Sequence, residues 1–219
     1  MVDVGARRDA FCKHLVRFYK TYCYAVEADP NLYHSIEETR RVKKFNIAIS
    51  DAEGPIRLAV SVSPTADSSP ADLLAARNPV IVHGMPFETF IRFANISSVD
   101  LLKIGAGRTA VKLFHSAGDD RIRGIPQITV RFPSPKEAPG FARKIRRIIT
   151  RLQSLGFLYF VFPKRSSLSI FYLSIAGILN TRRGPGFGSG SSRWFAEYGS
   201  GKAFISLLGI GSGLWYDES

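Results

Sequence analysis

The sequence contains only two cysteines, Cys12 and Cys23, and both lie near its start. Small secreted domains depend on several disulfides, so this scarcity excludes a disulfide framework and favours a reducing compartment or an organelle interior. Residues 1–20 contain no apolar core followed by a small-residue cleavage site, so we do not expect a signal peptide. We expect an N-terminal helix there, and a weak organellar presequence is the alternative.

Long apolar runs are also missing. The most apolar stretch, residues 155–179, is interrupted by Lys164, Arg165 and two serines. The uninterrupted part that begins at Leu168 has 12 residues, whereas a transmembrane helix needs about 20. We therefore predict no membrane span.

Acidic residues are scarce. Asp and Glu number 18 against 30 Lys and Arg, which gives a formal charge of +12. The apolar fraction is 45 %, so a chain of this length can bury a substantial core and is expected to be globular. The excess of positive charge favours an anionic partner, either a nucleic acid, a lipid surface or an acidic protein. It makes an enzyme for neutral metabolites less expected.

The scarcity of acid is greatest near the C-terminus, since no Asp or Glu occurs between Glu137 and Glu197. Arginine suits the geometry of phosphate groups, so we interpret this interval as a phosphate-binding surface, with an ordinary solvated face as the alternative. The interval holds the positive residues Arg143, Lys144, Arg146, Arg147, Arg151, Lys164, Arg165, Arg182, Arg183 and Arg193. Among them Arg143, Arg147 and Arg151 have a helical spacing at which like charges repel.

Apolar periodicity predicts alternating helices and strands. The expected elements are a helix over 7–26, hairpins over 41–63 and 109–132, a helix over 141–156 and strands after it. Proline-rich segments at 64–70 and 133–140 suggest boundaries. We therefore predict an α+β fold with two small α+β domains. Residues 1–65 form an N-terminal extension, 66–135 an N-terminal α+β domain, and 136–219 a basic RNA-binding α+β domain with a Gly-rich turn before its last strand.

The C-terminal part resembles a known family in the order of its elements. RRIITRLQSLGFLYFVF is similar to a basic segment that leads into a strand, and SIFYLSIAGILNTRRG to a strand that runs into a turn. SSRWFAEYGSGKAFISLL is similar to a short helix, a glycine turn and a final strand. Over residues 143–215 this order resembles the eighth small-subunit ribosomal protein in its bacterial and organellar form.

The resemblance implies a structural constituent of the small ribosomal subunit, which we expect in mitochondria. It implies ribosomal RNA and neighbouring small-subunit proteins as partners, no enzymatic activity, no cofactor and no small-molecule substrate. The first turn would contact RNA through Asn180, Thr181, Arg182, Arg183 and Gly184, and the second through Ser200 and Lys202. Arg143, Arg147, Arg151, Lys164 and Arg165 would bind its phosphates. The alternatives are a viral RNA-binding matrix- or capsid-type protein that self-associates and, after it, a small subunit of a membrane complex.

Other chemistry finds little support in the sequence. The segment YGSGKAF lacks the first glycine and the final hydroxyl residue of a phosphate loop, because Ala196 and Ala203 occupy those positions. Cys12, Cys23 and the histidines do not have the spacing of a zinc site. We therefore predict neither a nucleotide site, a metal site nor a catalytic residue.

Overall fold

The computed structural model describes residues 1–219 except 8–9, 60–78, 106, 134–139, 164–166 and 175–219. Residues Met1–Gly177 form one compact unit. Its main sheet takes strands from each of the three predicted divisions, 1–65, 66–135 and 136–219.

The main sheet is seven-stranded, with the order β3-β2-β1-β7-β8-β10-β9. The first five strands in this order run parallel, and β10 is antiparallel to both of its neighbours. The strands are β1 (Val2–Val4), β2 (Cys23–Val26), β3 (Val42–Phe45), β7 (Leu101–Ile104), β8 (Gln127–Pro133), β9 (Phe157–Pro163) and β10 (Ser167–Ser174). A second sheet, of order β4-β6-β5, consists of β4 (Ala48–Ile49), β5 (Gly54–Ala59) and β6 (Pro79–Met85).

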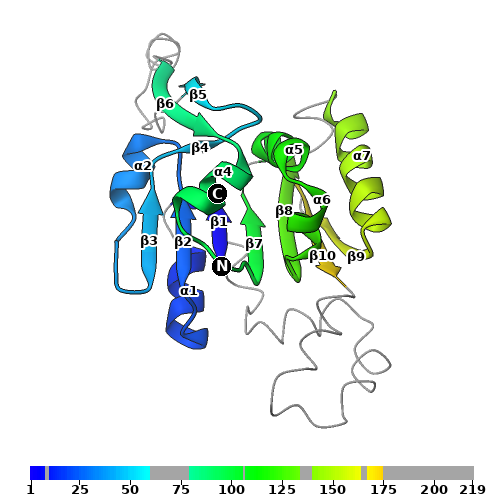
Figure 1. Ribbon diagram of the computed structural model, residues 1–219, viewed down its shortest axis with the longest axis horizontal. Coiled ribbons are helices and arrows are strands. Elements are labelled where there is room, and N and C mark those ends of the chain that lie inside the picture. The colour runs from blue at the N-terminus through cyan, green and yellow to red at the C-terminus, as the bar shows by residue number, and fades with distance from the viewer. Residues whose placement is uncertain (8–9, 60–78, 106, 134–139, 164–166, 175–219) are drawn as a thin grey trace. The chain divides into compact units, whose positions relative to one another are not determined.

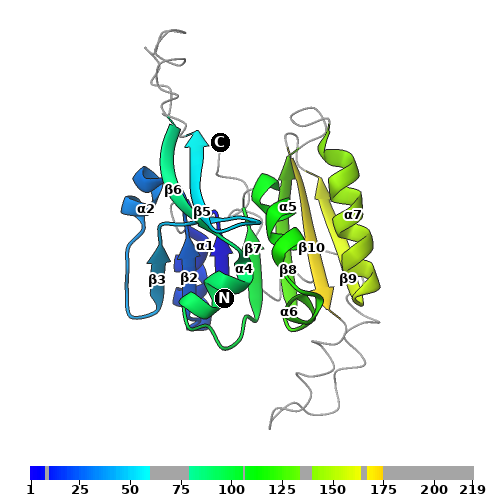
Figure 2. The same ribbon diagram turned by 45° about the horizontal axis from the view of Figure 1, so that its top comes forward.

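Helices cover both faces of the main sheet (Figures 1 and 2). They are α1 (Ala10–Tyr19), α2 (Pro30–Ser35), α4 (Phe87–Phe93), α5 (Gly107–Ser116), α6 (Asp119–Arg123) and α7 (Phe141–Ser154). The helix α1 lies on one face, and α4, α5, α6 and α7 lie on the other. Within the described ranges, no helix combines the length and apolar character that crossing a bilayer would demand.

The predicted α+β class is therefore wrong, and the fold is α/β. The order β3-β2-β1-β7-β8 reproduces the first five strands of a doubly wound, Rossmann-like sheet. The prediction failed because strands that are neighbours in the sequence were paired as hairpins. Parallel strands need a crossover instead, and in this protein α1, α2 and α5 with α6 supply it.

Both predicted hairpins are wrong for this reason. In the first, β3 belongs to the main sheet, whereas β5 pairs with β6 in the small sheet. In the second, residues 107–116 form α5 and residues 119–123 form α6. The buried residues Ala110, Leu113, Phe114 and Ala117 have the spacing of one helix face, which the short alternation in AVKLF concealed.

Two predicted helices are confirmed, one of them in a shorter form. The helix α7 spans Phe141–Ser154 and is followed by Gly156 at φ 90°, a left-handed conformation that glycine adopts without strain. The N-terminal helix ends at Tyr19 instead of reaching residue 26, because β2 begins at Cys23.

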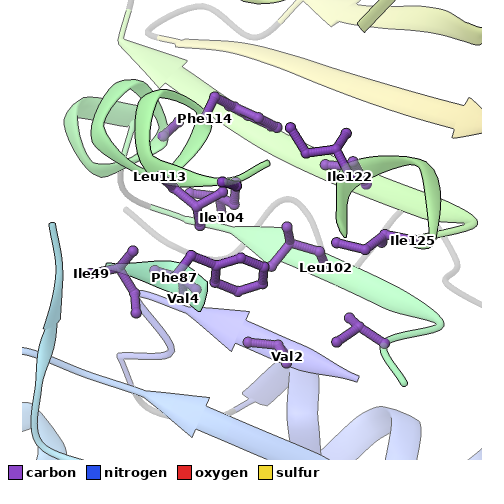
Figure 3. Close-up of a cluster of buried hydrophobic side chains, with 14 of the residues drawn as sticks. Val2, Val4, Ile49, Phe87, Leu102, Ile104, Leu113, Phe114, Ile122 and Ile125 are labelled. Carbon is purple, nitrogen blue, oxygen red and sulfur yellow. The ribbon is translucent and has the colours of Figure 1, made fainter. Parts of the chain in front are cut away.

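The hydrophobic core divides between the two faces of the sheet. On one face Val2, Val4, Leu102 and Ile104 pack under Phe87 and the residues of α5 and α6 (Figure 3). On the other face a smaller cluster beneath α1 includes Cys12, Leu15, Cys23 and Ala25. Alternate residues of β1 and β7 thus face opposite layers, and both layers exclude water.

Candidate functional site

The carboxyl ends of β1 and β7 form a topological switch point. The chain leaves β1 through α1 toward β2 and β3 on one side, whereas β7 and β8 lie on the other side. In open α/β sheets, ligands bind in the crevice that such a reversal opens beyond the carboxyl ends of the strands. This edge is therefore the candidate site.

The backbones that leave β1 and β7 approach each other closely at this edge. The N–H of Gly105 donates to the carbonyl oxygen of Val4 at 2.8 Å. A Cβ atom built on Gly105 would lie 2.8 Å from the carbonyl oxygen of Gly5, which is too close for any real side chain. The close approach of the two backbone segments thus requires glycine at position 105.

The loop after β1 resembles a nucleotide-binding turn with one departure. In the sequence G-x-G-x-x-G/A, the first glycine makes the tight turn and the second lets a pyrophosphate come close. Gly5 has φ 76° and fills the first position, and Ala10 fills the last. Arg7 occupies the second position in a left-handed conformation with φ 55°, and its side chain is exposed.

Glu27 follows β2 and lies beside this loop. Its Oε2 accepts a hydrogen bond from the N–H of Arg7 at 2.8 Å, and its Oε1 accepts one from the N–H of Asp29 at 2.9 Å. The residue is only 6 % exposed. Burial raises the pKa of the Glu27 carboxyl, and the two backbone N–H groups offset this effect only in part.

The neighbouring loops hold Glu27 in place. The side-chain amide of Asn46, which follows β3, donates to the carbonyl oxygens of Glu27 at 2.9 Å and Ala28 at 3.2 Å. Asp29 caps α2, since its Oδ1 accepts a hydrogen bond from the N–H of Asn31 at 2.9 Å. The Glu27 carboxylate therefore has a fixed position at the switch point before any ligand binds.

A carboxylate at this position can accept hydrogen bonds from the hydroxyls of a ribose. In doubly wound nucleotide-binding proteins, an acidic residue about 20 positions after the first glycine performs this role. Glu27 has that separation from Gly5, and each of its oxygens keeps accepting capacity beyond the backbone N–H it already binds. These residues fit the ribose of a nucleoside.

The sequence prediction missed this site. The segment VDVGARRDAFCKHLVRFYKTYCYAVEADP contains the signal. It holds a strand, a glycine, a helix and then an acidic residue at the end of the next strand. The signal was concealed because β1 and β2 are too short to show a clear alternation, and because β2 was assigned to a continuous helix over 7–26.

Of the predicted phosphate-binding residues, the structure describes Arg143, Arg147 and Arg151, which lie on α7. Arg143 and Arg147 are exposed on α7, where together with Arg146, Thr150, Arg151 and Ser154 they line an open hollow of about 400 Å³. Their binding of phosphate stays a prediction. Lys164, Arg165, Asn180, Thr181, Arg182, Arg183, Gly184, Ser200 and Lys202 lie outside the described residues.

Arg151 has a structural role. Its Nε donates to Oδ1 of Asp119 at 2.9 Å, and its Nη2 donates to the carbonyl oxygen of Ala117 at 2.8 Å. Its Nη1 donates to the carbonyl oxygen of Phe114. Arg151 thus satisfies carbonyls at the C-terminal end of α5 and joins that helix to α7.

No cluster of His, Cys, Asp and Glu suited to a metal ion occurs in the described part of the chain. The two cysteines are both buried and free. The hydrogen bond with Cys23, burial and the nearby Asp3 carboxylate together raise the pKa of the Cys12 thiol. The raised pKa disfavours the thiolate, which is the reactive form of cysteine.

Comparison with known proteins gave only distant likenesses. No family model matches the sequence, and no curated protein matches it. The TrmK structure of M. capricolum in complex with S-adenosyl-homocysteine matches with a TM-score of 0.45 and 9 % identity, over 79 % of this chain and 60 % of that one. The precorrin 8w decarboxylase of Methanobacterium thermoautotrophicum matches with a TM-score of 0.43 and 10 % identity, over 80 % of both chains.

A third match is the precorrin-6y C5,15-methyltransferase of Geobacter metallireducens GS-15. Its TM-score is 0.41 at 12 % identity, and the match covers 80 % of this chain and 78 % of that one. With TM-scores below 0.5, these likenesses assign neither a family nor an activity to the chain.

The ribosomal resemblance is corrected by the fold. Strands from residues 2–174 build one Rossmann-like sheet, and RRIITRLQSLGFLYFVF forms the C-terminal part of α7 and most of β9. The predictions of a small-subunit structural protein with ribosomal RNA as partner, and of a viral matrix-type protein, are therefore wrong. The expectations of no enzymatic activity and no small-molecule substrate rested on the same resemblance, so they are withdrawn with it. The mitochondrial location stays a prediction.

Proposed function

We propose that this chain binds S-adenosylmethionine at the carboxyl edge of β1, β2 and β7 and acts as a methyltransferase. The observation that carries the proposal is the buried Glu27 carboxylate, fixed by the N–H groups of Arg7 and Asp29 beside the switch point. A buried carboxylate is costly to the fold, and a ribose that donates two hydroxyl hydrogen bonds to it would compensate this cost.

The loop after β1 favours a nucleoside without a pyrophosphate. The second glycine of the fingerprint lets the backbone approach the phosphates of a dinucleotide, and Arg7 with its side chain stands in that place. The sheet also departs from that of the dinucleotide-binding proteins, because antiparallel β10 stands between β8 and β9. S-adenosylmethionine contains a ribose and no phosphate, so it fits the loop after β1.

Bound S-adenosylmethionine would supply an activated methyl group for an acceptor nucleophile. The residues of this chain would bind and orient it. Glu27 would accept hydrogen bonds from the ribose hydroxyls, and the turn at Gly5 would present its backbone to the ligand. The close approach of Gly5 and Gly105 would form the floor of the crevice.

Titration calorimetry of the full chain tests the proposal with S-adenosylmethionine, S-adenosyl-homocysteine and NAD⁺. We expect the two sulfur nucleosides to bind and NAD⁺ to bind at least tenfold more weakly. Glu27→Gln removes a charged hydrogen-bond acceptor, which is worth about 1.5–3 kcal/mol, so affinity should fall by about tenfold or more. Glu37→Gln is the matched control, because Glu37 is exposed and pairs with Lys13 away from the crevice.

The pH dependence gives a second measurement. The ionised carboxylate accepts both ribose hydroxyls, so affinity should fall as the pH is lowered through the raised pKa of Glu27. This fall should be absent in Glu27→Gln. Tighter binding of NAD⁺ than of the sulfur nucleosides, or equal affinities of the wild type and Glu27→Gln, would contradict the proposal.

A further inference from the structure

A group of exposed aromatic side chains lies at the end of the sheet opposite Glu27. Phe18 is 60 % exposed, Tyr19 is 43 % exposed and Tyr22 is 56 % exposed. We call these three residues the aromatic tip. They end α1 and form the turn that leads into β2, so three large apolar side chains gather within five positions of the chain.

The aromatic tip is held by the surrounding backbone. The N–H of Lys20 donates to the carbonyl oxygen of Val16 at 3.2 Å, and Lys20 adopts a left-handed conformation with φ 55° that turns the chain sharply after α1. The guanidinium of Arg41, which precedes β3, donates to the carbonyl oxygen of Lys20. The N–H of Cys23 donates to the carbonyl oxygen of Arg41 at 2.7 Å. The exposed rings thus project from a turn that is fixed at both ends.

Positive charge surrounds the aromatic tip. The guanidinium carbon of Arg17 lies 5.3 Å from the centre of the Phe18 ring, and that of Arg41 lies 5.0 Å from the centre of the Tyr22 ring. Lys20 is exposed between them. The surface therefore combines apolar rings with cations that lie over or beside them.

The aromatic tip and the candidate site lie at opposite ends of α1. The helix begins after the loop at the carboxyl end of β1 and ends at Tyr19, before the amino end of β2 (Figure 1). A partner that covers the aromatic tip would leave the crevice beside Glu27 open. The two surfaces can thus be tested separately.

We propose that the aromatic tip docks on a membrane surface rich in anionic lipids. Aromatic rings at the headgroup level and nearby Arg or Lys are the combination that peripheral proteins use at such a surface. Single-stranded nucleic acid fits less well, because its bases stack on the faces of aromatic rings. In the aromatic tip, guanidinium groups already cover one face of Phe18 and of Tyr22.

Flotation of the full chain with lipid vesicles tests this proposal. The vesicles contain phosphatidylcholine alone or phosphatidylcholine with phosphatidylserine. We expect binding to the mixed vesicles only, and weaker binding at high salt, because salt screens exposed charges. Each basic residue near the surface contributes about 1 kcal/mol, so Arg17→Gln should lower the partition coefficient about fivefold.

The aromatic contribution needs its own variants. Phe18→Ser with Tyr22→Ser should abolish flotation with the mixed vesicles and leave S-adenosylmethionine affinity at the wild-type value. Phe93→Ser removes a ring that is 64 % exposed on α4, and Arg92→Gln removes an exposed charge from the same helix, so both controls should float like the wild type.

Three outcomes would overturn the proposal. They are equal binding to the two kinds of vesicle, flotation of the Phe18→Ser, Tyr22→Ser variant like the wild type, and dimerisation in sedimentation that this double variant abolishes. The last outcome would assign the aromatic tip to a second copy of the chain. Circular dichroism of each variant would establish that it is folded before the vesicles are added.

Discussion

Two buried carboxylates, one in β1 and one directly after the adjacent strand β2, have opposite surroundings. Asp3, in the middle of β1, is fully buried, and its two oxygens lie 3.1 and 3.3 Å from Nζ of Lys103 on β7. Glu27, just beyond β2, is bound by two backbone N–H groups, and burial raises its pKa. The acid in the interior is thus neutralised by a lysine on a neighbouring strand, whereas the acid at the carboxyl edge is held by backbone N–H groups.

The difference shows how position along a strand decides what surrounds a buried acid. The ion pair of Asp3 and Lys103 joins β1 to β7 beneath α1, where Cys12 also donates to Asp3 at 3.7 Å. Such a pair ties the two strands of the switch point together. Glu27 lies one residue beyond the end of β2. Among the described hydrogen bonds of its carboxylate, both donors are backbone N–H groups, and none is a cation such as Lys103.

The largest effect is expected from removing the cation in the interior. Lys103→Met would leave the buried Asp3 carboxylate without its ion-pair partner, which costs about 3–5 kcal/mol. Urea unfolding should show this loss in the free energy of unfolding. Lys112→Met is the matched control, because Lys112 is exposed and pairs with Asp51 at 3.6 Å, and it should cost less than about 1 kcal/mol. Equal losses of unfolding free energy in Lys103→Met and Lys112→Met would contradict a larger contribution from the buried ion pair.

Replacing both partners should recover much of this loss. Apolar side chains of similar volume often substitute for a buried ion pair without a net cost. The double variant Asp3→Val, Lys103→Met should therefore be about 1–3 kcal/mol more stable than Lys103→Met alone. A double-mutant cycle of urea unfolding measures the coupling, and strictly additive losses would contradict a direct interaction.

At Glu27 we expect a small effect of opposite sign. Because its pKa is raised in the folded state, Glu27 contributes most to stability below the ordinary glutamate pKa of 4.5, and this contribution is lost as the pH rises through the raised value. Glu27→Gln does not titrate, so relative to the wild type it should gain stability as the pH rises from 4 to 7. Thermal unfolding at several pH values measures this gain. A relative loss of stability over the same range would show that the ionised carboxylate stabilises the fold.

The smallest effect is expected for a carboxylate at the surface. Asp119 has a half-exposed side chain that pairs with Arg151. Asp119→Asn should cost less than about 1 kcal/mol, because exposed ion pairs contribute little and Arg151 keeps the carbonyl oxygens of Phe114 and Ala117. Arg151→Ala should cost more in the same unfolding experiment, since it removes those contacts as well.

The sequence predicted a long element correctly and missed the shortest strands. The helix α7 has 14 residues and a continuous apolar stripe, so its periodicity was plain. The strands β1 and β2 have only 3 and 4 residues, which is too few for an alternation to stand out. Missing those strands also concealed the order of the sheet, because the parallel pairing of β1 with β2 and β7 joins residues far apart in the sequence.

The candidate site was lost for a related reason. Gly5 and Glu27 have meaning only as the ends of two adjacent parallel strands, and the sequence does not show that the strands are adjacent. The dense positive charge on α7 was visible but carried no information about its position in the fold. Composition therefore suggested an anionic partner, whereas the buried acid that points to a nucleoside is a single residue.

The position of β10 has a consequence for how the chain folds. This strand follows β9 in the sequence but lies between β8 and β9 in the sheet. During synthesis, β8 therefore presents an unpaired edge until residues 167–174 have emerged, and β9 cannot join the sheet before then. An incomplete chain would expose a strand edge of the kind that promotes aggregation. Closing the sheet is thus among the last steps, and truncation before residue 174 should yield insoluble protein.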